Sequence, residues 1–565
     1  MKIKTDIPNL FLIVVSLFLL SVQALVLGCS DLNHHIEPDN SSYYIDSENG
    51  KDTNNGFSPQ TAFKTLSKIN TINIKSGDTI LLASGLTYNG SLQLKNLKGT
   101  ENNPVVVSSY GNNNEKPVIN SKNFTGGVLI ENCSYVEVKN LTITANGKGD
   151  NAGINENDKM RCGVLINITK SGKYKHLYLK NITIKDIFFE NEGYERPNGE
   201  VNTPNGTQKY GYGIRVFNKI TGALLSNVKI NSCSIENVGH TGIKLTSYHK
   251  ENIYGISEID INNNNIVRSG GPGIQMSGVS DAHVFENVVN MSGSNDDTRK
   301  WGRGSGLWTW GSSDVLIEHN KFLNAHGPGD SAGAHIDFNC NNVVIQYNLS
   351  VNNAGGFCEI LGNNYNCSYR YNVSINDGYR VKGVDGAFQE GKILWFSGYC
   401  GKNSKRKGPF NTYIYNNTIY VKKDIVAKIA VDKASSGILI ANNIFYIEGE
   451  SKLVKGDQYK PEEGGGTSIE NVVFKNNIYL NKNNWPDDVL IRENEPEIGD
   501  PLFRNPGGMN TEDYIPSNIL LIKNRGIKVE KLPGDDIGLK TGLELKKDIL
   551  GNTITELPDI GAIEL

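Results

Sequence analysis

Six residues of contrasting chemistry recur at nearly constant spacing through the middle of the chain. Each is the variable position of a short phrase that opens with Gly and an aliphatic residue and returns about every thirty residues, with looser copies further on. The six positions are Arg215, Lys244, Gln275, Trp308, Asp337 and Glu359. If strand alternation turns the flanking apolar residues inward, these side chains form one column on the exterior, with roughly 4.8 Å between rungs. A line of cations, an amide, an aromatic ring and carboxylates is typical of a binding surface.

Arg215, Lys244 and His240 could together carry out β-elimination on a uronic acid. This reaction needs a cation to neutralise the carboxylate, a base to remove the C5 proton and an acid to protonate the oxygen that leaves C4. Arg215 is a permanent planar cation suited to a carboxylate or a sulfate. Lys244 is a candidate base, because a neighbouring cation and partial burial would lower its pKa. His240 precedes Lys244 by four residues and could act as acid or base.

A denser group of ionisable residues follows the Trp308 repeat. The stretch that ends at Asp330 contains His326 and is expected to form a turn. His335 and Asp337 then share one strand face, because their spacing of two matches the β-pleat. Together with Glu359 they could supply a histidine acid or base oriented by a carboxylate. Asp330, Asp337 and Glu359 could instead hold a calcium ion that neutralises the substrate, and no other cofactor is expected.

Further residues along the same strip are candidate substrate contacts. Gln275 could hold a sugar hydroxyl, and Trp308 and Trp310 offer faces on which pyranose rings can stack. The remaining candidates extend this cationic and aromatic strip: Arg303, His326, Glu359, Arg380, Lys392 and Trp395. Taken singly, each of them is equally typical of a solvated or packed side chain.

The elements that must position these residues are short strands repeated without helices between them. A fixed period near thirty residues is typical of a solenoid, whose units bury their apolar faces against each other. A second phrase ends in Asn, as in residues 317–320 and 345–348. Asn tolerates left-handed backbone, and its side chain can bond to the next Asn in the stack. The sequence therefore predicts an all-β parallel β-helix over residues 43–480, begun by a short helix within residues 62–69 and followed by a closing coil and cap over 481–565.

The first residues are predicted to be a lipoprotein signal peptide. A basic start and an apolar run over residues 10–20 precede small residues and Cys29. The pattern predicts a signal peptide at residues 1–28, lipidation of Cys29 and a polar tether over residues 29–42. The protein would then be an exported lipoprotein at the outer membrane or surface of a Gram-negative cell, and only its lipid would contact the membrane. An uncleaved anchor or an ordinary signal with a chance cysteine are the alternatives.

Composition adds few constraints. The chain has 565 residues and a formal net charge of −3, and we expect a monomer with no nucleic-acid partner. The seven cysteines besides Cys29 form no CxxC pair. They are expected to be mostly small buried hydrophobes in the coil interior, and no zinc pattern is visible.

From residue 43 onward the chain resembles carbohydrate-active right-handed β-helix proteins. The resemblance is carried by residues 43–46, 52–56, 62–66 and 77–80 near the start and by residues 500–503 and 558–562 near the end. It implies a right-handed, pectate-lyase-like solenoid. The whole chain looks most like the lyases that bacteria use on uronic-acid polysaccharides such as ulvan, and like the related oligosaccharide dehydratases. An acidic polysaccharide or oligosaccharide is therefore the expected substrate.

Three functions stay open at this stage. The expected one is β-elimination that leaves a 4,5-unsaturated uronate, by a chain-cleaving lyase or a chain-end dehydratase. The second is glycoside hydrolysis of an acidic glycan, with Asp337 and Glu359 as the two carboxyl groups. The third is a non-catalytic glycan-binding surface lipoprotein that uses its tryptophans. Fold alone is weak support for any of the three.

Overall fold

A computed structural model of the chain describes most of the residues after the predicted signal peptide. The described residues are 40–121, 124–145, 161–188, 211–250, 252–293, 303–454, 471–481, 493–494 and 496–565. The signal peptide, Cys29 and nearly all of the predicted tether lie outside them and stay predictions. No helix among the described residues is long and apolar enough to cross a bilayer.

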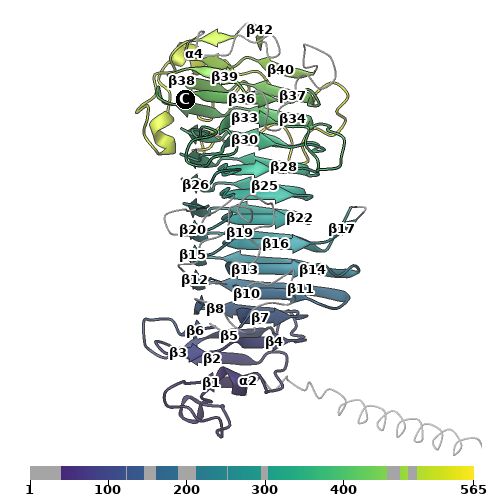
Figure 1. Ribbon diagram of the computed structural model, residues 1–565, viewed down its shortest axis with the longest axis vertical. Helices are drawn as coiled ribbons and strands as arrows, with labels where there is room; N and C mark the ends of the chain where they lie inside the picture. Colours follow the sequence, from purple (N-terminus) through teal and green to yellow (C-terminus); the bar gives the residue numbers. More distant parts are fainter. Residues whose placement is uncertain are drawn as a thin grey trace, which may run out of the picture. The chain divides into compact units, whose positions relative to one another are not determined.

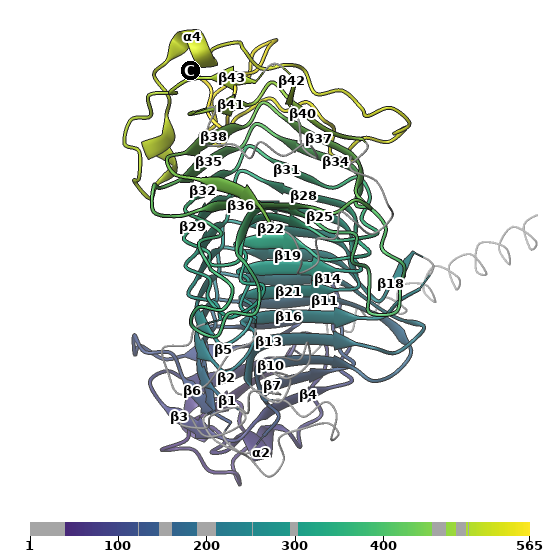
Figure 2. The ribbon, with the colours of Figure 1, turned by 45° about the horizontal axis from the view of Figure 1, so that its top comes forward.

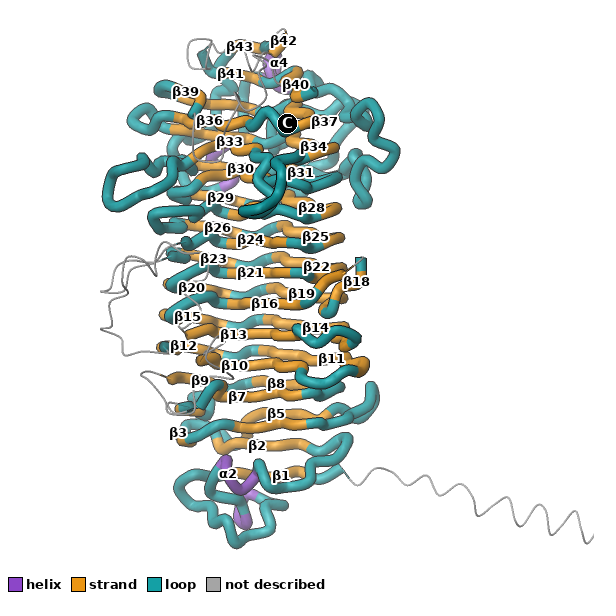
Figure 3. Tube along the Cα trace, turned by 45° about the vertical axis from the view of Figure 1, so that its right-hand side comes forward, coloured by secondary structure: helices purple, strands orange, loops and turns teal. Residues whose placement is uncertain are grey.

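Residues 42–565 form one compact unit, a right-handed parallel β-helix, as the sequence repeat predicts (Figure 1). Most coils give one strand to each of three long sheets, and the strands of these sheets pair in parallel with their counterparts in the next coil. Residues about thirty apart in sequence thus become neighbours in space. Figure 3 shows the coils stacked along the whole length of the unit.

The strands are grouped by sheet. The 15-stranded sheet contains β1 (Ser42–Ile45), β2 (Thr79–Ala83), β5 (Val105–Tyr110), β8 (Val136–Lys139), β11 (Gly172–Lys180), β14 (Ala223–Asn231), β19 (Ile256–Asn262), β22 (Val279–Phe285), β25 (Ser313–Glu318), β28 (Asn341–Gln346), β31 (Ser368–Arg370), β34 (Phe410–Tyr415), β37 (Ser436–Ala441), β40 (Val472–Lys475) and β42 (Glu493–Asn494). The 12-stranded sheet contains β4 (Leu92–Lys95), β7 (Gly126–Glu131), β10 (Arg161–Ile168), β13 (Gly211–Asn218), β16 (Ile243–Ser247), β21 (Ile274–Ser277), β24 (Leu307–Trp310), β27 (Ala334–Ile336), β30 (Gly356–Ile360), β33 (Lys392–Phe396), β36 (Ala427–Val431) and β39 (Ser451–Leu453). The 14-stranded sheet contains β3 (Thr87–Asn89), β6 (Val118–Asn120), β9 (Thr142–Ala145), β12 (Thr183–Ile187), β15 (Ser234–Val238), β20 (Asn265–Ser269), β23 (Val288–Asn290), β26 (Lys321–Leu323), β29 (Leu349–Val351), β32 (Val373–Ile375), β35 (Thr418–Val421), β38 (Ile444–Ile447), β41 (Ile478–Tyr479) and β43 (Glu497–Ile498). A small antiparallel pair, β17 (His249–Lys250) and β18 (Ile253–Tyr254), projects from the stack.

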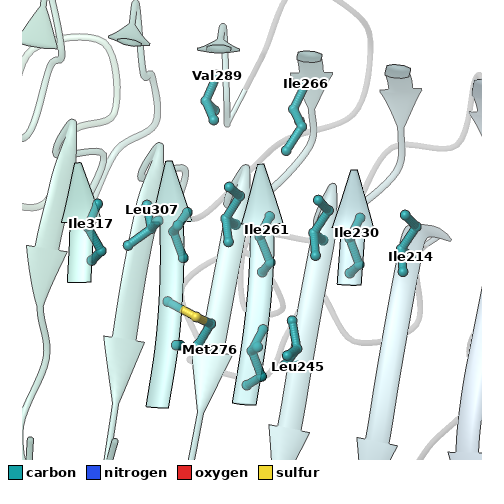
Figure 4. Packing of buried hydrophobic residues seen from close by; sticks show 14 of the residues in the cluster. Ile214, Ile230, Leu245, Ile261, Ile266, Met276, Val289, Leu307 and Ile317 are labelled. Atoms are coloured by element: carbon teal, nitrogen blue, oxygen red, sulfur yellow. The ribbon is translucent and has the colours of Figure 1, made fainter. Parts of the chain in front are cut away.

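Strand alternation fills the interior with aliphatic side chains. In β13, Ile214 and Val216 point inward and are fully buried. Leu245 and Met276 repeat the position of Val216 in the next coils, and Leu307 repeats that of Ile214. Figure 4 shows these side chains packed between the sheets. Burying one such side chain stabilises the fold by roughly 1.5–3 kcal/mol. This continuous core fixes which face of β13, β16, β21 and β24 turns outward.

Stacked asparagines connect successive coils, as the second sequence phrase predicts. In the interior ladder, the side-chain oxygen of each Asn accepts a hydrogen bond from the backbone N–H of the Asn one coil earlier, for example Asn348 from Asn320 at 2.9 Å. This ladder runs through Asn264, Asn287, Asn320, Asn348, Asn372, Asn417, Asn443 and Asn477. Asn416, Asn442 and Asn476, which end later copies of the phrase, form a separate ladder one residue earlier. The phrase is therefore offset by one residue between the early and the late coils.

Short helices and irregular segments cover the two ends. The predicted first helix is shorter than expected and comprises only α2 (Leu66–Ile69), which Thr65 caps and which buries Leu66 and Ile69. The other helical turns are η1 (Pro59–Thr61), η3 (Thr511–Tyr514) and α4 (Ile519–Ile522). The coils continue through β42 and β43, beyond residue 480. All seven cysteines of the described residues are free and buried.

The C-terminal residues wrap the last coils as well as closing them (Figure 2). Arg370 is fully buried and donates hydrogen bonds to the Gly542 carbonyl and the Thr541 hydroxyl. Tyr347 donates to the Lys547 carbonyl at 2.7 Å, and Leu539 packs among the tyrosines of this face. This segment therefore lies against the outer side of β28, β31 and β34.

Candidate functional site

The register of the 12-stranded sheet assembles the predicted column. Arg215 of β13 pairs with Lys244 of β16, and Lys244 pairs with Gln275 of β21. Gln275 in turn pairs with Trp308 of β24. Residues 93 positions apart, from Arg215 to Trp308, are thus brought into line on the outer face of one sheet.

His335, and not Asp337, occupies the next position of the column. Trp308 pairs with His335, and the pairing of Ile336 with Ile360 sets Glu359 beside His335. The prediction of Asp337 here was wrong by two residues. The matching phrase begins at Gly333, which follows an irregular turn and was not counted as part of the repeat.

The column is buried, in contrast to the predicted solvent-facing surface. Arg215 is 5% exposed, Lys244 7% and His335 2%. Gln275, Glu359 and Trp395 are also buried, whereas Trp308 is half-buried. The reason is that large neighbouring side chains pack over the strands, for example Trp308, whose ring stacks on His335 at 5.9 Å.

Asp337 follows His335 by two residues and lies beside Trp310, the next outward residue after Trp308 on β24. The backbone N–H of Asp337 donates to the Thr309 carbonyl, and the Trp310 ring contacts the Phe338 ring edge-on at 5.7 Å. Burial raises the pKa of Asp337 to about 7, and the charge of Asp330 adds to the effect. Asp337 therefore holds a proton for a substantial fraction of the time near neutral pH, although it stays partly accessible.

Asp330 joins this group through Arg303. The Arg303 Nη1 lies 3.3 Å from the Asp330 Oδ2. The carboxylate of Asp330, followed by those of Asp337 and Glu359, raises the pKa of Arg303. One arginine thus contacts Asp330 and interacts electrostatically with two further acidic side chains. Such a concentration of mutually perturbed titratable groups is typical of a functional site.

The backbone at Asp330 is strained. Asp330 and Ser331 have φ angles of 43° and 64°. Elsewhere among the described residues, non-glycine residues with positive φ occur singly. Two neighbouring residues in this sparsely populated region persist only where the surroundings hold them, which is a property of functional turns.

A loop between β32 and β33 holds this turn in place. Arg380 donates to the carbonyls of Gly327 and Asp330 at 3.0 and 2.9 Å, and to that of Gln389 at 2.8 Å. The Gln389 side chain accepts from the Asp330 backbone N–H at 2.7 Å. Arg380 was expected to bind substrate. Because it is buried on backbone carbonyls, it positions Asp330 instead.

His335 and Glu359 are buried next to each other. Burial lowers the pKa of His335 to about 4 and raises the pKa of Glu359 well above its ordinary value. Their closest atoms are 4.0 Å apart, but His335 is uncharged near neutral pH, so this contact is no ion pair. His335 also lies 3.1 Å from the Ser305 hydroxyl.

The remaining predicted residues have other neighbours. The Lys392 ammonium lies 3.8 Å from the centre of the Trp395 ring and donates to the Glu390 carbonyl. His326 contacts the Tyr379 hydroxyl at 3.0 Å, and Gln275 donates weakly to Ser277. His240 packs against the Tyr212 ring, as Arg215 does. The structure thus groups Arg215, Lys244 and His240 in one place and His335, Asp337, Glu359 and Arg303 in another.

Several buried donors on this outer face have no partner within the described part of the chain. They are the Arg215 Nε, the Thr246 hydroxyl, the Arg303 Nε and the indole N–H groups of Trp310 and Trp395. Buried donors are nearly always satisfied in folded proteins. These donors are therefore free to bond with water or with a polar ligand along the sheet.

Metal binding has less support. Among the described residues, no group of three or more His, Cys, Asp or Glu side chains is arranged to hold a metal ion. The geometry of Asp330, Asp337 and Glu359 therefore gives no support to the calcium hypothesis, because Arg303 already lies among these carboxyl groups.

Sequence reasoning missed two residues that shape the site, Gln389 and Ser305, which act through single contacts across coils. Asp330 was predicted, but only as a metal ligand. The Asp330 turn carried a signal, because Gly327, Gly329 and Gly333 crowd around it in the sequence. Gln389 carried none, since it lies in a loop outside the repeat.

Known proteins with a similar sequence or fold act on glycans. No protein-family sequence model matches the chain. A lacto-N-biosidase from Bifidobacterium longum subsp. longum is 24% identical over an alignment of 630 residues, which covers 93% of this chain. The alignment covers 36% of that enzyme, so the chain spans about a third of its relative.

Solved structures show the same fold. The native GH136 lacto-N-biosidase from Eubacterium ramulus superposes with a TM-score of 0.52 and 21% identity, covering 73% of this chain and 68% of that one. Its selenomethionine derivative gives a TM-score of 0.50 and 17% identity, covering 81% and 68%. The expected resemblance to carbohydrate-active β-helix proteins is thus confirmed for the fold. Its finer assignment to lyases of ulvan or other uronic-acid glycans is not.

Proposed function

We propose that this protein is a glycoside hydrolase that cleaves an oligosaccharide lying along the outer face of the 12-stranded sheet. The observation that carries the proposal is the pair of partly exposed carboxyl groups, Asp330 and Asp337, which both interact electrostatically with the Arg303 guanidinium. The sequence similarity to a lacto-N-biosidase over 93% of the chain supports hydrolysis rather than elimination.

Two carboxyl groups are what glycoside hydrolysis requires. One protonates the leaving oxygen, while the other acts as a carboxylate on the anomeric carbon or on water. In the unliganded protein Asp337 has the raised pKa, about 7, and Asp330 is held next to a permanent cation. The two environments differ in the way that separates an acid from a carboxylate.

Glu359 takes a supporting part, in contrast to the Asp337–Glu359 pair considered from the sequence. Its side chain is only 6% exposed, compared with 16% for Asp330. Substrate therefore reaches Asp330 and Asp337 more readily.

The substrate assay separates the candidate reactions. The compact unit of residues 42–565 is incubated with oligosaccharides that contain lacto-N-biose and, separately, with uronic-acid oligosaccharides of similar length. New reducing ends without ultraviolet absorbance are expected. Absorbance typical of a 4,5-unsaturated uronate would overturn the proposal, and binding without either product would indicate a glycan-binding protein.

β-Elimination stays the second candidate because of Lys244. Burial, followed by the charge of Arg215, lowers the pKa of Lys244 well below its ordinary value, as a general base requires. The Lys244→Met variant distinguishes the two reactions. A lyase would lose turnover on every substrate, whereas a hydrolase that uses Asp330 and Asp337 would keep turnover on neutral oligosaccharides.

We also propose that the protein is attached to a membrane surface through a lipid on Cys29. The support is the pattern of a basic start, an apolar run and small residues before the cysteine. Metabolic labelling with a radioactive fatty acid is expected to mark the wild type but not the Cys29→Ser variant. Equal labelling of both would refute the lipid site.

A further inference from the structure

Arg215 and Lys244 form a pair of adjacent buried cations at the other end of the candidate site. The two residues are direct strand partners on β13 and β16. The Arg215 guanidinium carbon lies 4.6 Å from the centre of the Tyr212 ring and 5.1 Å from that of Phe217. The Lys244 ammonium lies 5.5 Å from the same Tyr212 ring. Aromatic faces therefore fix both side chains in place.

Neither cation has an acidic partner or a hydrogen bond within the described residues, and the Arg215 Nε is a buried donor without an acceptor. The other buried cations differ. Arg370 donates to Gln346, Tyr415 and two groups of the C-terminal segment. Lys428 donates to the carbonyls of Gly378 and Arg380 and lies 3.7 Å from Glu390. The missing partner is thus particular to the Arg215–Lys244 pair.

Such a pair is costly for folding. Desolvation and the neighbouring charge disfavour holding both side chains as cations, and for this reason they lower the pKa of Lys244. The contacts with Tyr212 recover only part of this cost, since a cation–π contact contributes roughly 0.5–2 kcal/mol. Because no counter-ion lies beside the pair among the described residues, an anion from outside would complete the arrangement.

The position of the pair relates it to the carboxyl groups. Lys244 is three strands from His335, which is roughly 14 Å at the strand spacing of a sheet, and Arg215 is one strand further. Gln275 and Trp308 occupy the strands between. An extended oligosaccharide placed along this column would reach both ends at once.

We propose that Arg215 and Lys244 form a subsite for an anionic group, a carboxylate or a sulfate ester, carried by a sugar away from the bond that is cleaved. The inference rests on the proposed function and deepens it, because it assigns the substrate to the acidic glycans. The planar Arg215 fork matches the paired oxygens of either group. Lys244 supplies a second donor and takes up a proton when the anion binds.

Matched monosaccharides test the subsite without any knowledge of the full substrate. Glucuronate differs from glucose by its carboxylate, and galactose 6-sulfate differs from galactose by its sulfate. Binding is measured by calorimetry at constant ionic strength in the Asp337→Asn protein, which keeps the site but not the proposed chemistry. We expect at least one anionic sugar to bind tenfold or more tightly than its neutral counterpart, and the comparison of the two anions identifies the group.

Two variants show where the anion binds. Arg215→Gln is expected to reduce the preference for the anionic sugar to about one. Lys229→Gln removes a cation of the 15-stranded sheet that is ion-paired with Asp260 and should leave the preference unchanged. Each variant is first checked for an unchanged far-ultraviolet circular dichroism spectrum.

Proton uptake provides a readout that a merely structural role would not affect. Because the free Lys244 has a lowered pKa, anion binding should draw a proton from the buffer. The calorimetric enthalpy should then depend on the buffer's ionisation enthalpy, and Lys244→Met should remove this dependence. Equal affinity for charged and neutral sugars, or a preference that survives Arg215→Gln, overturns the inference. Loss of hydrolysis alone would bear on the proposed function and not on this subsite.

Discussion

Two regions on the outer face of one sheet differ in whether their buried ionisable side chains have partners of opposite charge. Around Asp330, Asp337 and Glu359, each charge has a partner in Arg303 or is removed by protonation. Around Arg215 and Lys244, two basic side chains lie next to each other without an acidic partner among the described residues. The comparison teaches that the first region compensates its charges internally, whereas the second leaves room for the anionic ligand that we propose.

The largest expected effect comes from removing one carboxyl group at a time from the Asp330–Asp337 region while leaving Arg215 and Lys244 intact. Asp337→Asn and Asp330→Asn should each lower kcat by roughly 10²–10⁴-fold, the usual contribution of a positioned acid or base. Reducing-end release measures the effect. Asp260→Asn, on the outer side of the 15-stranded sheet, is the matched control and should stay within twofold of the wild type.

Substrates with different leaving groups then show which of Asp330 and Asp337 is the proton donor and which is the carboxylate. Of the two variants, the one that lacks the proton donor should still hydrolyse aryl glycosides, whose leaving groups need little protonation. The other should be inactive on every substrate. Near-normal activity of both variants on natural oligosaccharides would remove the carboxyl pair from the mechanism.

The pH dependence of stability should have opposite signs for two neighbours. Asp337 has a folded pKa of about 7, above its ordinary 3.8. The folded state therefore binds more protons between about pH 4 and 7, and this residue's contribution to stability falls as the pH rises through that range. His335 has a folded pKa of about 4, below its ordinary 6.5, so its contribution rises between pH 4 and 6.5.

Single substitutions of Asp337 and His335 make these two opposing pH dependences of stability measurable. Relative to the wild type, Asp337→Asn should gain stability from pH 4 to pH 8, by an amount on the order of 4 kcal/mol. His335→Gln should lose relative stability over the lower part of that range. Melting temperatures by calorimetry at several pH values provide the test. Parallel curves for both variants would mean that neither residue is shifted.

A third contrast compares two buried lysines on the same sheet. Lys428 of β36 donates to two backbone carbonyls and approaches Glu390. Lys428→Met should therefore destabilise the protein by about 2–3 kcal/mol, because hydrogen bonds to a charged group are lost. Urea denaturation followed by circular dichroism measures the change, and an unchanged midpoint would contradict the contacts.

The smallest expected effect has the opposite sign. Lys244→Met keeps the length of the side chain and removes a buried amine that has no hydrogen-bond partner among the described residues, so it should stabilise the protein by about 1 kcal/mol. The same urea titration detects it. If Lys244→Met destabilises as strongly as Lys428→Met, Lys244 has a structural partner and the two regions are alike.

Much of this arrangement could be predicted from the sequence, because strand alternation and the repeat are local. The inward Ile214 and Ile243 fixed the outward direction of Arg215 and Lys244, and their spacing of 29 residues made them neighbours. The error at Asp337 arose where the turn before Gly333 departs from the regular coil. A turn of irregular length resets the register, and only its three-dimensional path shows by how much.

Other features could not be predicted because they depend on contacts between distant segments. Arg380 and Gln389 lie in a loop without the repeat, and their role follows from the carbonyls and the N–H group of the Asp330 turn. The burial of the column had the same origin, since the sequence shows which side of a strand faces outward but not what packs over it.

The wrapping of the last coils by residues 524–565 has a consequence for biogenesis. A solenoid can stack from its first coil onward, so the coils that carry Arg215 and Lys244 can form before the C-terminal segment has docked. The coils that carry Asp337 and Glu359 lack the partners of Tyr347 and Arg370 until Thr541–Lys547 are in place. The part of the molecule assigned to bond cleavage is therefore the last to reach its final packing.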